Sequence, residues 1–364
     1  MTATPSDNLD SNGDALAEDR AYQDDALPGV SRTFALTIPQ LPPPLRDAVT
    51  NAYLLCRIAD TIEDEEALDP AQKNRFHDEF VAVVEGKAPA NAFAASLDPL
   101  LNGRTIPAER ELVTNTERVV RVTHSFGKAQ RDALQRCVAV MCNGMPGFER
   151  KRSLAGLDSL EELNRYCYYV AGVVGEMLTS LFCDYSPRIA RHRNRLMELA
   201  VSFGQGLQMT NILKDIWDDR RSATCWLPQE VFSEAGFDLA SLDASRYDEA
   251  FGTGLNSLIS VTHGHLRNAL DYTLTIPRKE QGIRRFCLWA IGLSVLTLRK
   301  ISRRPDFTDA THVKVSRRAL KTTIVTTNLL GGSNAALRGL FALASAGLPK
   351  PHYNASDVQA GETA

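Results

Sequence analysis

The stretch Gln208-Met-Thr-Asn-Ile-Leu-Lys-Asp-Ile-Trp-Asp-Asp219 predicts a helix that carries one polar stripe. At 3.6 residues per turn, four polar side chains fall at i, i+3, i+7 and i+11 and share one narrow face: Gln208, Asn211, Asp215 and Asp219. Apolar side chains take the other faces, so we expect the helix to be partly buried. Two amides and two carboxylates suit a cavity that holds cations and an anionic ligand, although an acidic stripe alone is more often a solvated helix face.

A second acidic stripe lies far upstream, in Arg57-Ile-Ala-Asp-Thr-Ile-Glu-Asp64. Arg57, Asp60 and Asp64 share a face, with Glu63 beside them, and a strongly apolar run precedes them. Two carboxylates about 4 Å apart repel by roughly 4 kcal/mol at an effective dielectric near 20, so two facing stripes need protons, water or cations. Oxygen ligands without His or Cys favour Mg²⁺. Together the stripes predict a metal-bridged diphosphate site.

The composition is that of a globular protein. The chain has 364 residues, of which 44% are hydrophobic and 23% charged, and its net charge of -3 argues against a nucleic-acid binder. The seven cysteines are scattered without a C-x-x-C pair, which indicates a reduced cytoplasmic protein without structural zinc. The longest apolar run, 286–298, is shorter than the roughly 20 residues that span a bilayer. We therefore expect no transmembrane segment, and leave open a peripheral membrane contact through the basic, apolar C-terminal third.

The pattern along the chain predicts an all-α fold, because no strand-like alternation persists. Residues 1–27 are expected to be a disordered acidic tail, residues 28–348 a single helical bundle around a deep apolar cavity, and residues 349–364 a C-terminal tail. A helix expected at about 159–184 contains Gly172 and further small residues. Each glycine costs about 1 kcal/mol relative to alanine, so either close helix packing or a ligand against bare backbone must offset that cost.

Four motifs resemble the squalene/phytoene synthase family, and the resemblance covers about residues 31–346. They are Ser31-Arg-Thr-Phe-Ala35, the Arg57–Asp64 stripe, Tyr166-Cys-Tyr-Tyr-Val-Ala-Gly-Val-Val-Gly175, and Gln208–Asp219 with Leu227-Pro-Gln-Glu230. The third and fourth motifs are most similar to the eukaryotic squalene-synthase branch. The resemblance implies an all-α isoprenoid-synthase fold. It also implies head-to-head condensation of two farnesyl diphosphates through presqualene diphosphate, followed by NADPH-dependent reduction to squalene.

The resemblance implies residue roles as well. Mg²⁺ binding is implied for Asp60, Glu63, Asp64, Asp215 and Asp219, and all of these except Glu63 are also implied in catalysis. Tyr169 is implied beside the reacting carbons, where it steers a cation or relays a proton. The implied substrate-binding residues are Ser31, Arg32, Phe34, Tyr53, Arg57, Gly172, Gln208, Asn211 and Lys214. The implied NADPH contacts are Arg32, Arg57, Lys314 and Arg317. We expect a monomer whose substrate is farnesyl diphosphate, located in the cytoplasm or peripherally at a membrane.

Two departures from the family pattern concern the second diphosphate. Lys214 stands where many members carry Arg, which keeps the charge and loses the planar fork. Thr224-Cys225 replaces an arginine-bearing pair, and Arg220 or Arg221 are the candidate substitutes. Two alternative functions stay open. One is the same condensation without reduction, which gives dehydrosqualene or phytoene, and the other is a non-catalytic scaffold of this fold.

Overall fold

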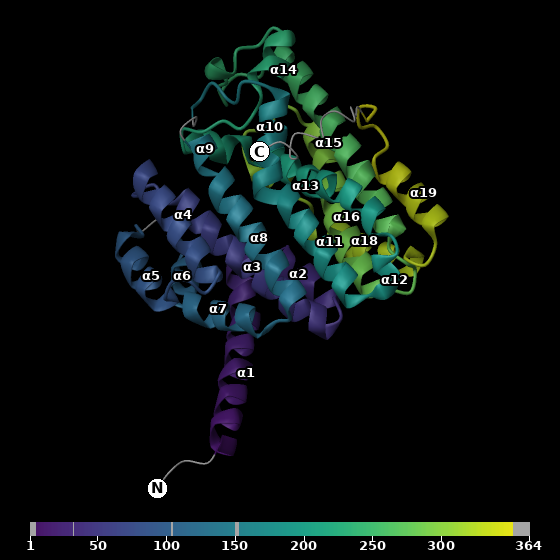
Figure 1. Ribbon diagram of the computed structural model, residues 1–364. Helices are drawn as coiled ribbons and strands as arrows, with labels where there is room; N and C mark the ends of the chain where they lie inside the picture. The colour runs from purple at the N-terminus through teal and green to yellow at the C-terminus, as the bar shows by residue number, and fades with distance from the viewer. Residues whose placement is uncertain (1–4, 32, 103–104, 150–152, 352–364) are drawn as a thin grey trace. The chain divides into compact units, whose positions relative to one another are not determined.

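A computed structural model describes residues 5–31, 33–102, 105–149 and 153–351, and these residues are helical almost throughout (Figure 1). Within them, the β-structure amounts to one isolated bridge, between Leu157 and Pro228. The predicted all-α fold is confirmed. The helices form two compact units, one of residues 1–149 with 180–185 and the other of residues 150–179 with 186–364.

The first unit is built around α3 (Pro43–Asp64), which contacts α1, α4, α6, α7 and α8. Thirteen of its 22 residues are buried, which agrees with the apolar run that precedes the acidic stripe. A proline at its first position fixes the backbone angle that starts a helix. The other helices of this unit are α1 (Pro5–Val30), α2 (Phe34–Thr37), α4 (Pro70–Val84), α5 (Ala90–Leu97), α6 (Pro107–Thr114), α7 (Thr116–Ser125), α8 (Lys128–Gly144) and α9 (Pro146–Glu149).

The N-terminal segment differs from its prediction. Residues 5–27 belong to α1, so the expectation of a disordered tail is wrong for them. Asp19 of α1 is only 2% exposed, and its carboxylate accepts hydrogen bonds from Arg118 (2.9 Å) and Arg121 (2.8 Å) of α7. Burial would raise the pKa of Asp19, but the two guanidinium groups outweigh it and hold the pKa below its usual value. The tail is ordered by partners about a hundred residues away, which its own composition could not indicate.

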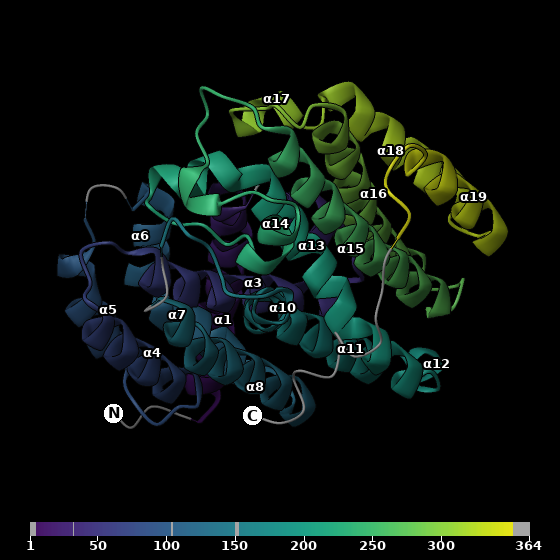
Figure 2. The same cartoon turned by 90° about the horizontal axis from the view of Figure 1, so that it is seen from above.

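The second unit is built around α13 (Arg193–Arg221), which packs against α15 (Glu249–Thr275) and α16 (Gln281–Arg303). Its remaining elements are α10 (Leu160–Cys167), the π-helical turn η3 (Tyr168–Gly172), α11 (Val173–Tyr185), α12 (Pro187–Ala190), α14 (Gln229–Glu234), α17 (Ala310–Val313), α18 (Arg317–Leu330) and α19 (Asn334–Ala344). The last residues of α11 belong to the first unit. α18 and α19 lie together along α16 in both views (Figure 1 and Figure 2).

Glycines allow η3 and α11 to approach α13 very closely. A Cβ atom placed on Gly175 would lie 2.1 Å from the carbonyl oxygen of Ala200, and one on Gly204 would lie 2.1 Å from that of Ala171. Both positions therefore exclude any side chain. Of the two explanations for the glycines of this helix, close helix packing is the one that applies to Gly175.

The continuous helical segment Leu160–Tyr185 is the one among the described residues with the length and apolar composition to cross a membrane. Core helices of globular proteins often have the same two properties. Its close packing against α13 is that of such a core helix.

Candidate functional site

The acidic stripe of α3 is confirmed as one partly exposed face on an otherwise buried helix. Tyr53, Arg57, Asp60 and Asp64 follow one another at intervals of three or four residues and keep solvent contact, while Ile58 and Ile62 are fully buried. Arg57 Nη1 lies 3.8 Å from Asp60 Oδ2, and its other terminal nitrogen donates to the carboxylate of Glu109, on α6. Burial would lower the pKa of Arg57, but these carboxylates raise it and keep the side chain a cation.

The carboxyl group of Asp60 is the most perturbed acid of this stripe. Burial raises the pKa of Asp60 to about 7, opposed by Arg57 and reinforced by Asp64 and Glu109. Because 35% of the Asp60 side-chain surface is still exposed, water screens part of this effect, and 7 is an upper bound. A carboxyl group that titrates close to neutral pH is a feature of functional sites.

The end of α3 forms a small polar hollow. Its volume is about 100 Å³, which holds several water molecules. Glu65, the residue after α3, accepts hydrogen bonds from the main-chain nitrogen of Asn102 (3.0 Å) and from the hydroxyl of Thr105 (2.6 Å), and so holds these two residues in the wall of the hollow. Glu63 is half-buried beside this region, and the buried Lys73 donates to its main-chain carbonyl. The lining residues are Thr61, Asp64, Glu65, Glu66, Asn102, Thr105 and Glu109.

The Ser31–Ala35 motif meets α3 at Tyr53. The hydroxyl of Ser31 accepts a hydrogen bond at 3.0 Å from the main-chain nitrogen of Phe34, the first residue of the short helix α2. The rings of Phe34 and Tyr53 lie 5.1 Å apart, and the Tyr53 hydroxyl donates to the carbonyl oxygen of Val30 at 3.2 Å. The structure thus brings Ser31, Phe34 and Tyr53 together, while Arg32 lies outside the described residues.

The second acidic stripe is confirmed on α13. Gln208, Asn211, Asp215 and Asp219 all keep solvent contact, and Ile212 and Ile216 between them are buried. The predicted anion contact Lys214 is already near this stripe. Its ammonium group lies 3.1 Å from Asp215 Oδ2 and 3.4 Å from Asn211 Oδ1. Burial raises the pKa of Asp215, and Lys214 opposes the shift.

The segment after α13 carries the second departure from the family pattern. Thr224 and Cys225 are both buried, and neither side chain is a cation. Arg220 donates to the carbonyl oxygens of Leu154 (3.2 Å) and Leu239 (3.1 Å), and Arg221 forms an ion pair with Asp218. Both candidate substitutes are therefore engaged in holding loops and the helix end.

Tyr169 lies in η3, where the helix widens to a π-turn. The sequence predicted an uninterrupted helix here, and π-turns of this kind occur often at functional sites. Tyr169 is half-buried, and its ring meets that of Tyr168 edge-on at 5.4 Å. Gly172 ends the turn and is buried. A Cβ atom placed on Gly172 would be in tight contact with Tyr168 and Val201.

Lys314 and Arg317 lie on either side of the start of α18 and are both exposed. The carbonyl oxygen of Lys314 accepts a hydrogen bond from the ammonium group of Lys300 at 2.6 Å. Neither Lys314 nor Arg317 forms an ion pair with any residue that the structure describes. Both charges are thus available to bind an anion.

Glu109 is the site residue that sequence reasoning missed. It accepts a hydrogen bond from Arg57 and lines the hollow beside Asp64. In the sequence, however, a glutamate in the first turn of a helix is common, so nothing marked Glu109 as a site residue. In the described part of the chain, no group of three or more His, Cys, Asp or Glu side chains is arranged to hold a metal ion. Mg²⁺ needs no such group, because one or two carboxylates, several waters and substrate phosphates usually complete its shell. The oxygen donors of both stripes therefore fit Mg²⁺.

Comparison with known proteins places the chain among squalene/phytoene synthases. The family model for squalene/phytoene synthase matches residues 27–319. A squalene synthase of Eremothecium gossypii is 30% identical over 284 residues, covering 77% of this chain and 61% of that protein. A squalene synthase of Candida albicans is 29% identical over 282 residues, covering 76% and 60%. The chain thus spans about three fifths of the length of these curated relatives.

Solved structures confirm the predicted isoprenoid-synthase type of fold. The structure of TcSQS with the ligand BPH1237 is 23% identical, with a TM-score of 0.71, and covers 94% of this chain and 95% of that one. A dehydrosqualene synthase with a bound ligand is 21% identical, with a TM-score of 0.61, and covers 86% and 96%. From the family match over most of its length, with both acidic stripes in place, the chain belongs to the squalene/phytoene synthase family.

Proposed function

We propose that this chain is an Mg²⁺-dependent squalene synthase. It joins two farnesyl diphosphates head to head through presqualene diphosphate and then uses NADPH to reduce that intermediate to squalene. The observation that carries the proposal is the pair of partly exposed acidic faces on buried helices, α3 and α13. The names of the curated relatives support squalene as the product.

On α3, Asp60 and Asp64 hold the metal and Arg57 binds phosphate oxygens. Arg57 suits this role because its guanidinium is a planar fork and Glu109 keeps it charged and positioned. Bound Mg²⁺ supplies neutralisation of the departing diphosphate. Asn102 and Thr105 line the adjoining hollow, which is large enough for several water molecules.

On α13, Asp215 and Asp219 are the metal ligands, and Gln208, Asn211 and Lys214 bind the second diphosphate. Lys214 acts there as a point charge, since no planar guanidinium is free beside it in the described structure. Tyr169 of η3 orients the reacting hydrocarbon and holds a proton at its hydroxyl oxygen. NADPH supplies a hydride, and Lys314 and Arg317 bind its phosphates.

The proposal is tested by incubating the purified chain with farnesyl diphosphate and Mg²⁺, with and without NADPH, and separating the products by chromatography. Squalene should form only with NADPH. A product that is the same in both reactions would support the non-reducing alternative, dehydrosqualene or phytoene synthesis, and a longer-chain substrate preference would favour phytoene. If no diphosphate is released, the condensation itself is refuted, which leaves the scaffold reading.

Matched variants separate the stripes from other acids. Asp60→Asn and Asp215→Asn should each lower the rate of diphosphate release by about a hundredfold or more, since each removes charge stabilisation at the departing group. Asp132→Asn is the control, because Asp132 is exposed on α8 and, among the described residues, pairs with Lys128 alone. Equal activity of all three variants would remove the acidic stripes from the mechanism.

A further inference from the structure

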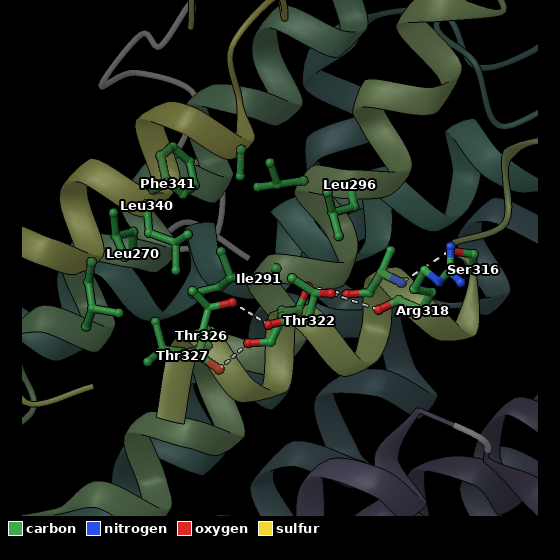
Figure 3. A pocket seen from close by; sticks show the side chains of 17 residues that line it. Leu270, Ile291, Leu296, Ser316, Arg318, Thr322, Thr326, Thr327, Leu340 and Phe341 are labelled. Carbon is green, nitrogen blue, oxygen red and sulfur yellow. Dashed lines mark hydrogen bonds between the residues drawn. The ribbon is translucent and has the colours of Figure 1, made fainter. Parts of the chain in front are cut away.

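An elongated apolar groove lies between α16, α18 and α19 in the second unit, with Leu270 of α15 at one end (Figure 3). Its volume is about 460 Å³, which is within the range of ligand pockets. The α18 residues along it run from Arg318 to Thr327, a length of roughly 14 Å at 1.5 Å per residue. The groove contains none of the residues assigned to the condensation.

The interior of the groove offers hydrocarbon contact and almost no hydrogen bonding. Four threonines of α18 line it, and each hydroxyl donates to a carbonyl of the preceding turn: Thr322, Thr323, Thr326 and Thr327 (Figure 3). These donors are therefore already used within the helix. The facing side chains of α16 and α19, such as Ile291 and Phe341, are apolar. A ligand along the groove is consequently a hydrocarbon chain.

The other end of the groove is cationic. Figure 3 shows Arg318 and Ser316 at one end, with Leu340 and Phe341 toward the opposite end. Arg318 lines this end of the groove, and Lys321 follows it by three residues on α18 outside the lining. Both are exposed and form no ion pair with any residue in the described ranges. Residues 310–350 contain six Lys and Arg and no Asp or Glu, although the whole chain is net negative. The charge at this end is therefore complementary to an anionic head group.

The outer face of α18 continues the same pattern. Arg318, Lys321, Val325 and Leu329 are spaced three or four residues apart and share one exposed face. Val325 is 57% and Leu329 78% exposed, and Leu343 of the adjoining α19 is 71% exposed. Exposed aliphatic side chains beside lysine and arginine characterise helices that lie at a membrane surface.

We propose that this groove binds an acyl chain of an anionic phospholipid and so docks the second unit on a membrane surface. The acyl chain of the lipid lies between α16 and α18, and its phosphate group lies at Arg318 and Lys321. Val325, Leu329 and Leu343 enter the interfacial layer beside it. The proposal is independent of the proposed reaction, because lipid binding needs neither substrate nor cofactor.

The test is flotation of the purified chain with vesicles of phosphatidylcholine alone or mixed with phosphatidylglycerol. The chain should float only with the mixed vesicles, and less at high salt. The double variant Arg318→Ala with Lys321→Ala should bind roughly 25-fold more weakly, at about fivefold for each cation near an anionic surface. Its diphosphate release should be unchanged.

A charge-neutral variant tests the groove itself. Thr326→Phe fills it and should weaken vesicle binding about tenfold, the effect of displacing only two methylenes of an acyl chain. Thr253→Phe is the control, because Thr253 is an exposed α15 threonine whose hydroxyl also donates to its own helix, and it should bind like wild type. Thr322→Phe, closer to Arg318, repeats the test in case Thr326→Phe fails to fold.

Three results would overturn the proposal. The first is a wild-type chain that does not float with the anionic vesicles. The second is a folded, groove-filled variant that floats as well as wild type, since charge alone would then explain binding. The third is a dimer in light scattering that Thr326→Phe dissociates, because the groove would then be covered by a second copy of the chain.

Discussion

Adding Mg²⁺ near pH 7 should release a proton from Asp60. Burial raises the pKa of Asp60 to about 7, and Asp64 and Glu109 reinforce that shift against Arg57. A metal ion binds the carboxylate and not the carboxylic acid, so binding and deprotonation are linked. Without Mg²⁺, Asp60 affects the free energy of unfolding in the opposite direction to a carboxylate whose pKa is lowered by folding. The folded chain holds this proton more tightly than the unfolded chain, so this group lowers the free energy of unfolding as pH rises from 3.8 to about 7.

The pH dependence of Mg²⁺ binding follows from a pKa of about 7 for Asp60. The ionised fraction of Asp60 rises from about a tenth at pH 6 to about nine tenths at pH 8, so Mg²⁺ affinity at this carboxylate should rise by up to about tenfold. At pH 7 about half a proton should be released for each ion bound. Solvent screening of Asp60 moves the midpoint below 7 and shifts these values to lower pH.

The assay is potentiometric titration of the wild type and of Asp60→Asn, without and with Mg²⁺. The difference between the two curves should show one group with a midpoint well above 3.8, and Mg²⁺ should move that midpoint to lower pH. Asp132→Asn, which removes an exposed acid on α8, serves as the control for the loss of one carboxylate. A wild-type difference curve centred near 3.8, or one that Mg²⁺ leaves unchanged, would refute the reasoning.

Three further predictions concern residues that the tertiary structure singled out. Asp19→Asn should lower the free energy of unfolding at pH 7 by about 2–3 kcal/mol, because Arg118 and Arg121 lose the buried carboxylate that accepts their hydrogen bonds. Since the pKa of Asp19 is lowered, this difference in free energy of unfolding should disappear as pH falls through that pKa. Urea unfolding of both proteins at pH 7 and below that pKa measures it, and a difference that persists at the lower pH would contradict the role of the ion pair. Gly175→Ala should cost about 1–3 kcal/mol by overpacking, whereas Gly339→Ala, in open space on α19, should raise thermal stability slightly; similar melting temperatures would contradict this. Glu109→Gln should raise KM for farnesyl diphosphate more than it lowers kcat, because Arg57 loses its positioning partner. It should also shift the pH–rate profile to lower pH, because it removes a negative charge that raises the pKa of Asp60. An unchanged profile would count against both roles of Glu109.

The sequence by itself determined the helices and the faces that carry the chemistry. The stripes at Asp60 with Asp64 and at Asp215 with Asp219 lie on single faces of α3 and α13 as predicted. That prediction succeeded because spacing along a helix fixes which side chains share a face, whatever the helix packs against. The four motifs were equally sufficient to place the chain in its family, since each is a local pattern.

Only the tertiary structure decided which distant groups support those faces. Asp19 is held by arginines 99 and 102 residues away, and Glu109 holds Arg57 across 52 residues. The docking of α1 and the positioning of Arg57 follow from these pairs, and neither leaves a local pattern to read. Arg220 is a further example. The sequence left its guanidinium available to a diphosphate, whereas in the structure it donates to loop carbonyl oxygens. The physical reason is that helical periodicity is fixed by the backbone over a few residues, whereas ion pairs between helices depend on how the whole chain packs.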